Sequence, residues 1–120
     1  MGCGLPIAIA TPQPIAPTGS NRPTRDVVLK ATAFKSYVPI YQRTKREFQL
    51  ATDPAFTSLV FTASPNSDQV AIGLHLNKAT TYYWRCRDFT SVSGVKSPWS
   101  QVATFTTIPD YLYRGQKNHK

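Results

Sequence analysis

Apolar and polar side chains alternate, one residue after the other, along several short segments of this chain. Strict alternation of this kind is typical of a β-strand that turns one face to a core and the other to solvent. The alternating or short apolar segments are residues 27–34, 46–52, 59–61, 69–74, 80–87 and 99–107. Turn-forming residues separate them, as at Asp53-Pro54 and Pro65-Asn66. Because no long segment shows the 3.6-residue period of a helix, the pattern predicts an all-β protein.

The segment 80–87 alternates most clearly and defines the two faces of one long strand. Its inward face is predicted to hold Tyr82, Trp84 and Cys86, and its outward face Tyr83, Arg85 and Arg87. We interpret Cys86 as a buried thiol that acts as a small hydrophobe, as free cysteines often do in cores. The outward residues form a candidate interface, and Glu47 is expected to pair with Arg85 or Arg87 across neighbouring strands.

The start of this strand carries the spacing Leu76-x-x-x-Thr80-x-Tyr82. A tyrosine in this position can bury its ring while its hydroxyl bonds to the backbone a few residues upstream, as in the tyrosine corner of immunoglobulin-like sandwiches. We therefore predict that Leu76, Thr80 and Tyr82 fix the crossing between two sheets, with the tyrosine hydroxyl bound near Leu76.

The chain from about residue 15 to residue 107 resembles a fibronectin type III domain. The resemblance rests on the corner motif and on Trp84-Arg-Cys86-Arg87, Trp99-Ser100 and Phe105-Thr-Thr107. The segments 29–34 and 48–56 are similar to the version found in bacterial surface proteins and tailed-phage virion proteins. The resemblance implies a two-sheet antiparallel β-sandwich of the immunoglobulin-like kind. The early strand lacks the tryptophan of many animal members, so Trp84 and Trp99, with Phe105, are expected to form the aromatic core.

A length of 120 residues is enough for one domain with a single core. We expect an extended N-terminal arm over residues 1–11, the sandwich over residues 12–108 and a basic C-terminal tail over residues 109–120. The arm is punctuated by proline and glycine, and the tail is polar with two tyrosines, so both suit docking against a partner. The candidate docking residues here are Ile7, Ile9, Pro12, Tyr111, Tyr113 and Arg114.

The chain is basic, with 14 lysines and arginines against 6 aspartates and glutamates, and its net charge is +8. Such a balance favours acidic partners. The positive charges are spread over apparent turns and termini, and only residues 43–46 form a cluster. We interpret this cluster as part of a solvated basic surface, so a nucleic-acid partner is not expected. No apolar run approaches the ~20 residues that cross a bilayer, so no membrane partner is expected either.

The sequence carries few groups suited to catalysis. His75 and His119 are the only histidines, and neither lies near a nucleophile motif. Cys3 and Cys86 are far apart and form no metal-binding Cys-x-x-Cys pair. A glycine-rich phosphate loop is also missing. We therefore expect no enzymatic activity, no metal and no cofactor.

The start of the chain shows no secretion signal, because prolines interrupt the apolar residues that follow Met1. Domains of the type it resembles usually work outside cells, and virion proteins reach that setting without export because particles assemble in the host cytoplasm. We therefore expect a structural subunit of a tailed-phage virion, such as a decoration, cement or tail-accessory protein. Its partners would be other virion proteins, contacted by the two terminal arms, with several copies in each particle. Two alternatives stay open: a host-attachment module that binds cell-surface glycan, and an adhesion domain of a larger bacterial surface protein.

Overall fold

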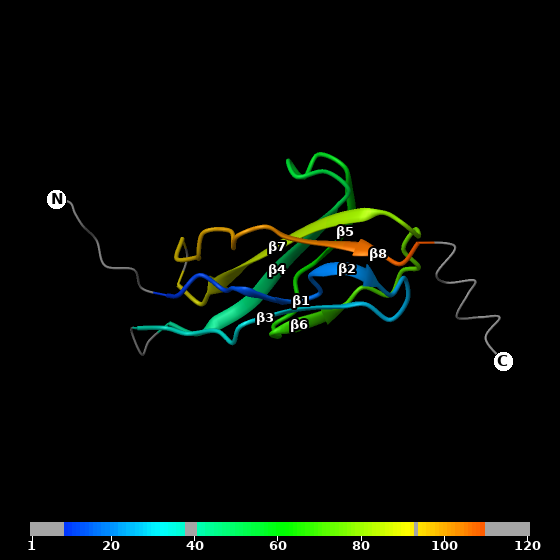
Figure 1. The fold of residues 1–120 in the computed structure, drawn as a ribbon. Helices are drawn as coiled ribbons and strands as arrows, with labels where there is room; N and C mark the ends of the chain where they lie inside the picture. Colours follow the sequence, from blue (N-terminus) through cyan, green and yellow to red (C-terminus); the bar gives the residue numbers. More distant parts are fainter. Residues whose placement is uncertain (1–8, 38–40, 93, 110–120) are drawn as a thin grey trace.

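The computed structural model describes residues 9–37, 41–92 and 94–109, and the regular structure within these ranges is entirely β (Figure 1). The strands are β1 (Pro14–Ala16), β2 (Gly19–Arg22), β3 (Val28–Ala31), β4 (Arg43–Ala51), β5 (Leu59–Ala63), β6 (Gln69–Ala71), β7 (Thr81–Thr90) and β8 (Ala103–Thr107). The all-β architecture predicted from the alternating pattern is therefore confirmed.

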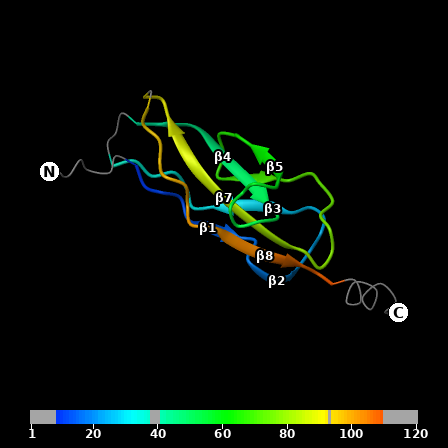
Figure 2. The same cartoon turned by 90° about the horizontal axis from the view of Figure 1, so that it is seen from above.

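The strands form two sheets, which we call the smaller sheet, with the order β1-β3-β6, and the larger sheet, with the order β2-β8-β7-β4-β5. All neighbouring strands run antiparallel except β2, which lies parallel to β8. Figures 1 and 2 show the long strands β4 and β7 side by side, and Figure 1 shows β1, β3 and β6 together beside them. This is the two-sheet sandwich that the resemblance implied.

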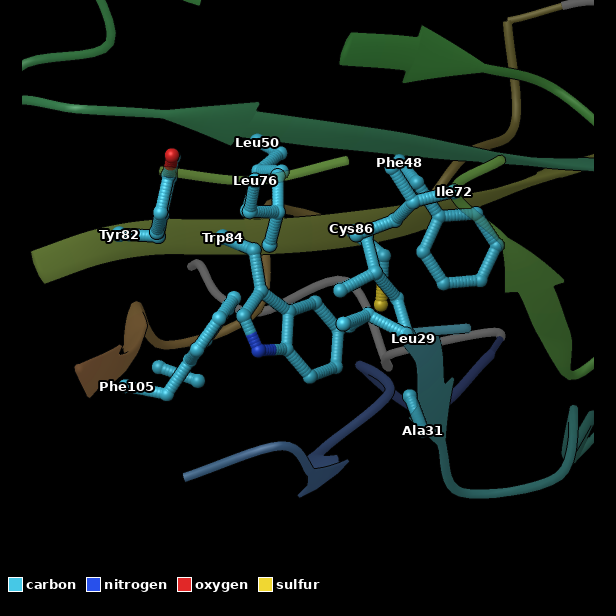
Figure 3. Close-up of a cluster of buried hydrophobic side chains, with 12 residues drawn as sticks. Leu29, Ala31, Phe48, Leu50, Ile72, Leu76, Tyr82, Trp84, Cys86 and Phe105 are labelled. Atoms are coloured by element: carbon cyan, nitrogen blue, oxygen red, sulfur yellow. The ribbon is translucent and has the colours of Figure 1, made fainter. Parts of the chain in front are cut away.

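The core lies between the sheets and is built by every second residue of the long strands (Figure 3). Phe48 and Leu50 of β4 meet Trp84 of β7, and each of these three side chains has 0% exposure. The rings of Phe48 and Trp84 lie 6.4 Å apart between centroids. The indole N–H of Trp84 donates to the carbonyl oxygen of Pro17 at 3.0 Å, so its polar atom is paired as well. Burial of such large apolar side chains contributes about 1.5–3 kcal/mol each, which makes this cluster the main source of stability.

The predicted tyrosine corner is present. The backbone N–H of Asn77 donates to the hydroxyl oxygen of Tyr82 at 2.9 Å, one residue beyond the buried Leu76. The ring of Tyr82 stacks on Phe105 of β8 at 5.5 Å between centroids. Thr80 is only half-buried, and it contributes through its backbone N–H, which donates to the hydroxyl of Thr107 at 3.0 Å. The corner thus ties the segment before β7 to the end of β8.

Two of the apolar segments leave the core earlier than the alternation predicts. Continued from Leu29 and Ala31, the alternation would place Ala33 inward, but β3 ends at Ala31 and Ala33 is exposed. In the segment 69–74, the alternation of Val70 and Ile72 would place Leu74 inward as well, but Leu74 is 46% exposed. Gly73 has a φ of 73°, a conformation that favours glycine, and it turns the chain away from the sheet just before Leu74.

Candidate interaction surface

The outer face of the larger sheet carries the residues predicted to point away from the core. The register of β4 and β7 places Lys45 opposite Phe89, Glu47 opposite Arg87 and Gln49 opposite Arg85. The next pair along the strands joins Ala51 to Tyr83. Cross-strand neighbours of this kind have side chains in direct contact, so the outer face is a series of paired rows.

Both arginines of β7 are held by partners on β4. The Nε and Nη2 groups of Arg85 donate to the Oε1 atom of Gln49 at 3.0 and 2.9 Å. Arg87 donates to Glu47 and forms a salt bridge of 2.9 Å with it, so the expected pairing of Glu47 falls on Arg87. Burial, and then the nearby charge of Arg87, lower the pKa of Arg85, although Glu47 partly offsets both effects. Two guanidinium groups therefore share a single carboxylate in these rows.

The side chain of Trp99 lies between the two arginines. The guanidinium carbons of Arg85 and Arg87 are each 4.1 Å from the centre of its ring. Since residues two apart on a strand are separated by about 7 Å, a ring this close to both must be inserted between them. Trp99 was predicted to lie in the core beside Trp84. That prediction is wrong, because Trp99 packs on the outer face.

A bulge explains why Trp99 points outward. The backbone N–H of Ser97 donates to Asp88 and that of Ser100 donates to Cys86, both at 2.8 Å. Ala103 is opposite Trp84. Three residues of this segment therefore span only two of β7 twice, from Ala103 back to Ser100 and from Ser100 back to Ser97, and each step is the signature of a β-bulge. The extra residue between Ala103 and Ser100 exchanges the two faces of the segment, so Ser100 is buried like Ala103 and Trp99 turns outward. The second extra residue, between Ser100 and Ser97, brings Ser97 inward again. The sequence predicts a last strand that begins at Trp99. For the same reason as above, β8 begins only at Ala103.

Aromatic rings extend this arrangement in both directions. The ring centre of Phe56 lies 4.1 Å from the guanidinium carbon of Arg85, and that of Phe89 lies 5.1 Å from Arg87. The order Phe56, Arg85, Trp99, Arg87, Phe89 thus alternates rings and cations, and we call it the cation–aromatic stack. Each contact between a cation and a ring is worth about 0.5–1 kcal/mol at an exposed site.

The turn after β4 presents Phe56 to this stack. The carboxylate of Asp53 accepts hydrogen bonds from the hydroxyl of Thr57 at 2.7 Å and from the backbone N–H of Ser58 at 2.7 Å. These bonds, the Thr57 hydroxyl first among them, hold the pKa of Asp53 below its usual range. Phe56 itself has a φ of 60°, a backbone conformation that is uncommon for residues other than glycine. The ring is positioned by local hydrogen bonding as well as by its contact with Arg85.

A buried ion pair lies on the inner face of the same strands. Arg46 of β4 and Asp88 of β7 both have 0% exposure. Nε and Nη2 of Arg46 donate to the two carboxylate oxygens of Asp88 at 2.6 and 2.9 Å, and Nη1 donates to the carbonyl oxygen of Asp68 at 3.2 Å. Burial alone would lower the pKa of Arg46, but the hydrogen bond and the charge of Asp88 outweigh it and raise that pKa. The guanidinium is therefore charged inside the sandwich.

The sequence interpretation placed Arg46 in a solvated basic cluster over residues 43–46, and this was wrong. The alternation itself held the signal that would have found the pair. Arg46 has the same parity as Phe48 and Leu50, and Asp88 has the same parity as Trp84 and Cys86. Two opposite charges at inward positions of adjacent strands point to a buried ion pair.

Cys86 lies beside this pair and is buried. Burial raises the pKa of its thiol to about 11, with the charge of Arg46 and the hydrogen-bonding contact with Ser100 acting in the opposite direction. The thiol is therefore protonated at neutral pH and behaves as the small apolar side chain that the sequence predicted.

Two of the candidate docking residues are not available on the surface. Ile9 has 3% exposure, and Pro12 is among the fully buried side chains. The backbone N–H of Ala10 donates to Lys35 at 2.9 Å, which holds this part of the predicted arm against the sandwich. The expectation that Ile9 and Pro12 face a partner is corrected accordingly. Tyr83 is half-buried on the outer face, beside Arg85.

Four other candidates, Ile7, Tyr111, Tyr113 and Arg114, lie outside the described residues. Within the part of the chain that the structure describes, no group of three histidine, cysteine, aspartate or glutamate side chains could hold a metal ion. His75 is exposed near the end of the turn that follows β6. Across the same described ranges, no helix has the length and apolar character needed to span a membrane.

Comparison with known proteins connects this chain to a fold. No family model and no curated protein matches it. Its structure is similar to the sixth fibronectin type III domain of human fibronectin type III domain containing protein 3, with a TM-score of 0.62, 19% identity and coverage of 92% of both chains. Another solved structure, of a fibronectin type III domain of human fibronectin type III domain containing protein 3, gives a TM-score of 0.58 at 18% identity, with 92% of this chain and 93% of that chain covered.

A part of the α-L-rhamnosidase from Dictyoglumus thermophilum is also similar, with a TM-score of 0.64 at 13% identity. That similarity covers 85% of this chain but only 12% of the rhamnosidase. At these identities the likeness concerns the fold alone. The chain has a fibronectin type III-like fold, as its corner motif and strand pattern predicted.

Proposed function

We propose that this chain is a non-enzymatic structural subunit of a tailed-phage virion, and that it docks on an acidic surface of a neighbouring virion protein. The observation that carries the proposal is the cation–aromatic stack on the outer face of the larger sheet. Arginine and tryptophan are the residues that most often dominate the energetics of protein interfaces. Here Arg85, Trp99 and Arg87 lie next to one another at half-buried positions.

The stack is also held in place before any partner arrives. Gln49 fixes the guanidinium of Arg85 and Glu47 fixes that of Arg87, while Trp99 packs between them. A side chain that is already ordered loses little entropy on binding, so such a surface binds more tightly than a mobile one of the same area. Among the described residues, Glu47 is the one carboxylate that forms a salt bridge with the two arginines of the stack. The outer face around the stack is therefore complementary to an acidic partner.

The virion setting rests on the similarity of segments 29–34 and 48–56 to the version of this domain found in bacterial surface proteins and tailed-phage virion proteins. In this proposal the terminal segments make further contacts with neighbouring subunits, and several copies occupy each particle. The main alternative, a host-attachment module for glycan, would need open aromatic faces on which sugar rings could stack. The rings of the stack are instead covered by cations: Trp99 by two arginines, and Phe89 by Arg87 and Lys45. This arrangement favours a protein partner over a glycan.

The test is incorporation into particles. Virions purified from cells that express the chain in its native context should contain it at several copies per particle, measured by quantitative mass spectrometry. The Arg85→Gln/Arg87→Gln variant should fold, as judged by its circular dichroism, and be incorporated at least about tenfold less. A matched control, Arg22→Gln/Arg25→Gln, removes the same charge from exposed positions away from the stack and should be incorporated normally. Absence of the wild-type chain from particles, or saturable binding on a glycan array, would overturn the proposal.

A further inference from the structure

We propose that the end of the larger sheet around Phe89 contains a binding site for a carboxylate group of an acidic protein segment. A groove of about 320 Å³ lies there, between β4, β7 and the turn that follows β7. Lys45, Phe89 and Lys96 line it, together with the hydroxyl-bearing Thr44 and Thr90. A volume of this size is at the lower end of the range for ligand sites, so it suits a side chain and not an extended ligand.

The strand register brings two lysines to the same ring. Lys45 of β4 is directly opposite Phe89 on one side, and Lys96 forms an isolated bridge with Phe89 on the other. The ammonium groups of Lys45 and Lys96 lie 4.6 and 5.7 Å from the ring centre. Backbone pairing on both sides of Phe89 thus places the two ammonium groups near one aromatic ring.

Within the described ranges, no acidic side chain balances the charges of this groove. Among the described residues that line it there is no aspartate or glutamate. Neither Lys45 nor Lys96 forms a salt bridge within the described ranges, whereas the nearby Arg87 is paired with Glu47. Two unbalanced ammonium groups at the rim of a small groove attract an anionic group, and the attraction is strongest for one that fits between them.

The chemistry of the groove selects among anions. Nucleic acids bind to such surfaces by stacking bases on free aromatic faces as well as by phosphate contacts. The face of Phe89 is approached by three cations, Lys45, Lys96 and Arg87, so it offers no free platform for a base or a sugar. What remains is the charge itself, in a space large enough for one acidic side chain. We therefore assign the site to an aspartate or glutamate of a partner protein.

This inference rests on the proposed function in one respect, which is that the partner is a protein. The groove and its charges follow from the geometry of the described residues alone. The experiment is a titration of the isotope-labelled full chain with a short oligoglutamate peptide, followed by NMR at low ionic strength. Saturable shifts should appear at Lys45, Phe89 and Lys96. The Lys45→Gln/Lys96→Gln variant should bind about tenfold more weakly, because it removes both ammonium groups that would contact the carboxylate.

A matched control is the Lys30→Gln/Lys35→Gln variant, which removes two exposed lysines elsewhere. Its net charge is the same as that of the Lys45→Gln/Lys96→Gln variant. It should bind like the wild type. Equal weakening in both variants would show an effect of net charge only and would overturn the site. Tighter binding of an oligonucleotide of equal charge, or no saturable binding of the peptide, would overturn it too. The measurement uses the isolated chain, so its result is independent of whether the chain is incorporated into virions.

Discussion

Two ion pairs lie next to each other in the same strand ladder and have opposite roles. Arg46 pairs with Asp88 and Glu47 pairs with Arg87, in consecutive register positions of β4 and β7. The chemistry is the same in both, but the side chains of the first pair are 0% and 1% exposed and those of the second are both 23% exposed. One residue along a strand changes the face, and with it the dielectric environment of the charge.

The inner pair neutralises two charges that are buried in the core, and the outer pair orients side chains on the surface. Withdrawing the charges of Arg46 and Asp88 from water costs several kcal/mol per ion, which only close geometry and further hydrogen bonds can offset. The structure supplies both, with two direct bonds and a third to the carbonyl oxygen of Asp68. Solvent screens the outer pair, so its chief effect is to orient Arg87 against Trp99.

The largest effect is expected from removing one partner of the inner pair. Arg46→Met should lower the free energy of unfolding by about 3–5 kcal/mol, because it leaves the carboxylate of Asp88 buried without a counter-charge. Urea denaturation followed by circular dichroism measures the change. The double variant Arg46→Met/Asp88→Leu should recover most of the loss, since no charge then remains buried. A single variant as stable as the wild type would mean that the pair is not buried in solution.

An intermediate effect is expected from breaking the stack on the outer face. Trp99→Ala removes the ring between Arg85 and Arg87 and should lower the free energy of unfolding by about 2 kcal/mol, from two cation contacts and lost apolar packing. Trp99→Phe keeps a ring in place and should lose clearly less in the same urea assay. Equal losses in the two variants would argue that the ring is not in contact with the cations.

A smaller effect is expected at the tyrosine corner. Tyr82→Phe keeps the ring stacked on Phe105 but removes the hydroxyl that accepts a hydrogen bond from Asn77. The free energy of unfolding should fall by about 1 kcal/mol, the usual net worth of one such bond. Thermal or urea midpoints detect a change of this size. An unchanged midpoint would mean that the corner does not stabilise the fold.

The smallest effect is expected from the outer ion pair. Glu47→Gln should change the free energy of unfolding by less than about 1 kcal/mol, since exposed pairs contribute little. The difference between this variant and the wild type should shrink further in high salt, which screens exposed charges but not buried ones. The loss in Arg46→Met should persist in the same salt series. If both variants respond to salt alike, the contrast between the two faces fails.

Much of the fold could be predicted from local sequence pattern. The alternation of Tyr82, Trp84 and Cys86 with Tyr83, Arg85 and Arg87 gave the two faces of β7, and the spacing from Leu76 to Tyr82 gave the corner. Both signals lie within a single segment, where the pleat of a strand fixes which side each residue faces. The buried pair of Arg46 and Asp88 also lay within reach of the same parity argument, although charge favoured a surface assignment.

The position of Trp99 could not be predicted in the same way. Counting back from Phe105, alternation places Trp99 inward, and the extra residue between Ser100 and Ala103 reverses that parity. A bulge is defined by pairing with another strand, so it is not written in the spacing of one segment. The burial of Ile9 similarly depends on its bridge to Ser36, which is distant in sequence.

The sequence by itself determined the class of fold, the long strand and its corner, because these follow from residue spacing and from the alternating geometry of an extended chain. The tertiary structure decided which cations and rings meet. It inserted Trp99 between Arg85 and Arg87, placed Lys45 and Lys96 over Phe89, and enclosed Arg46 with Asp88. The physical reason is that register between strands, and the bulge that shifts it, arise only when separate segments pair. The candidate interaction surface is therefore a property of strand pairing, and the core that supports it is a property of the strands themselves.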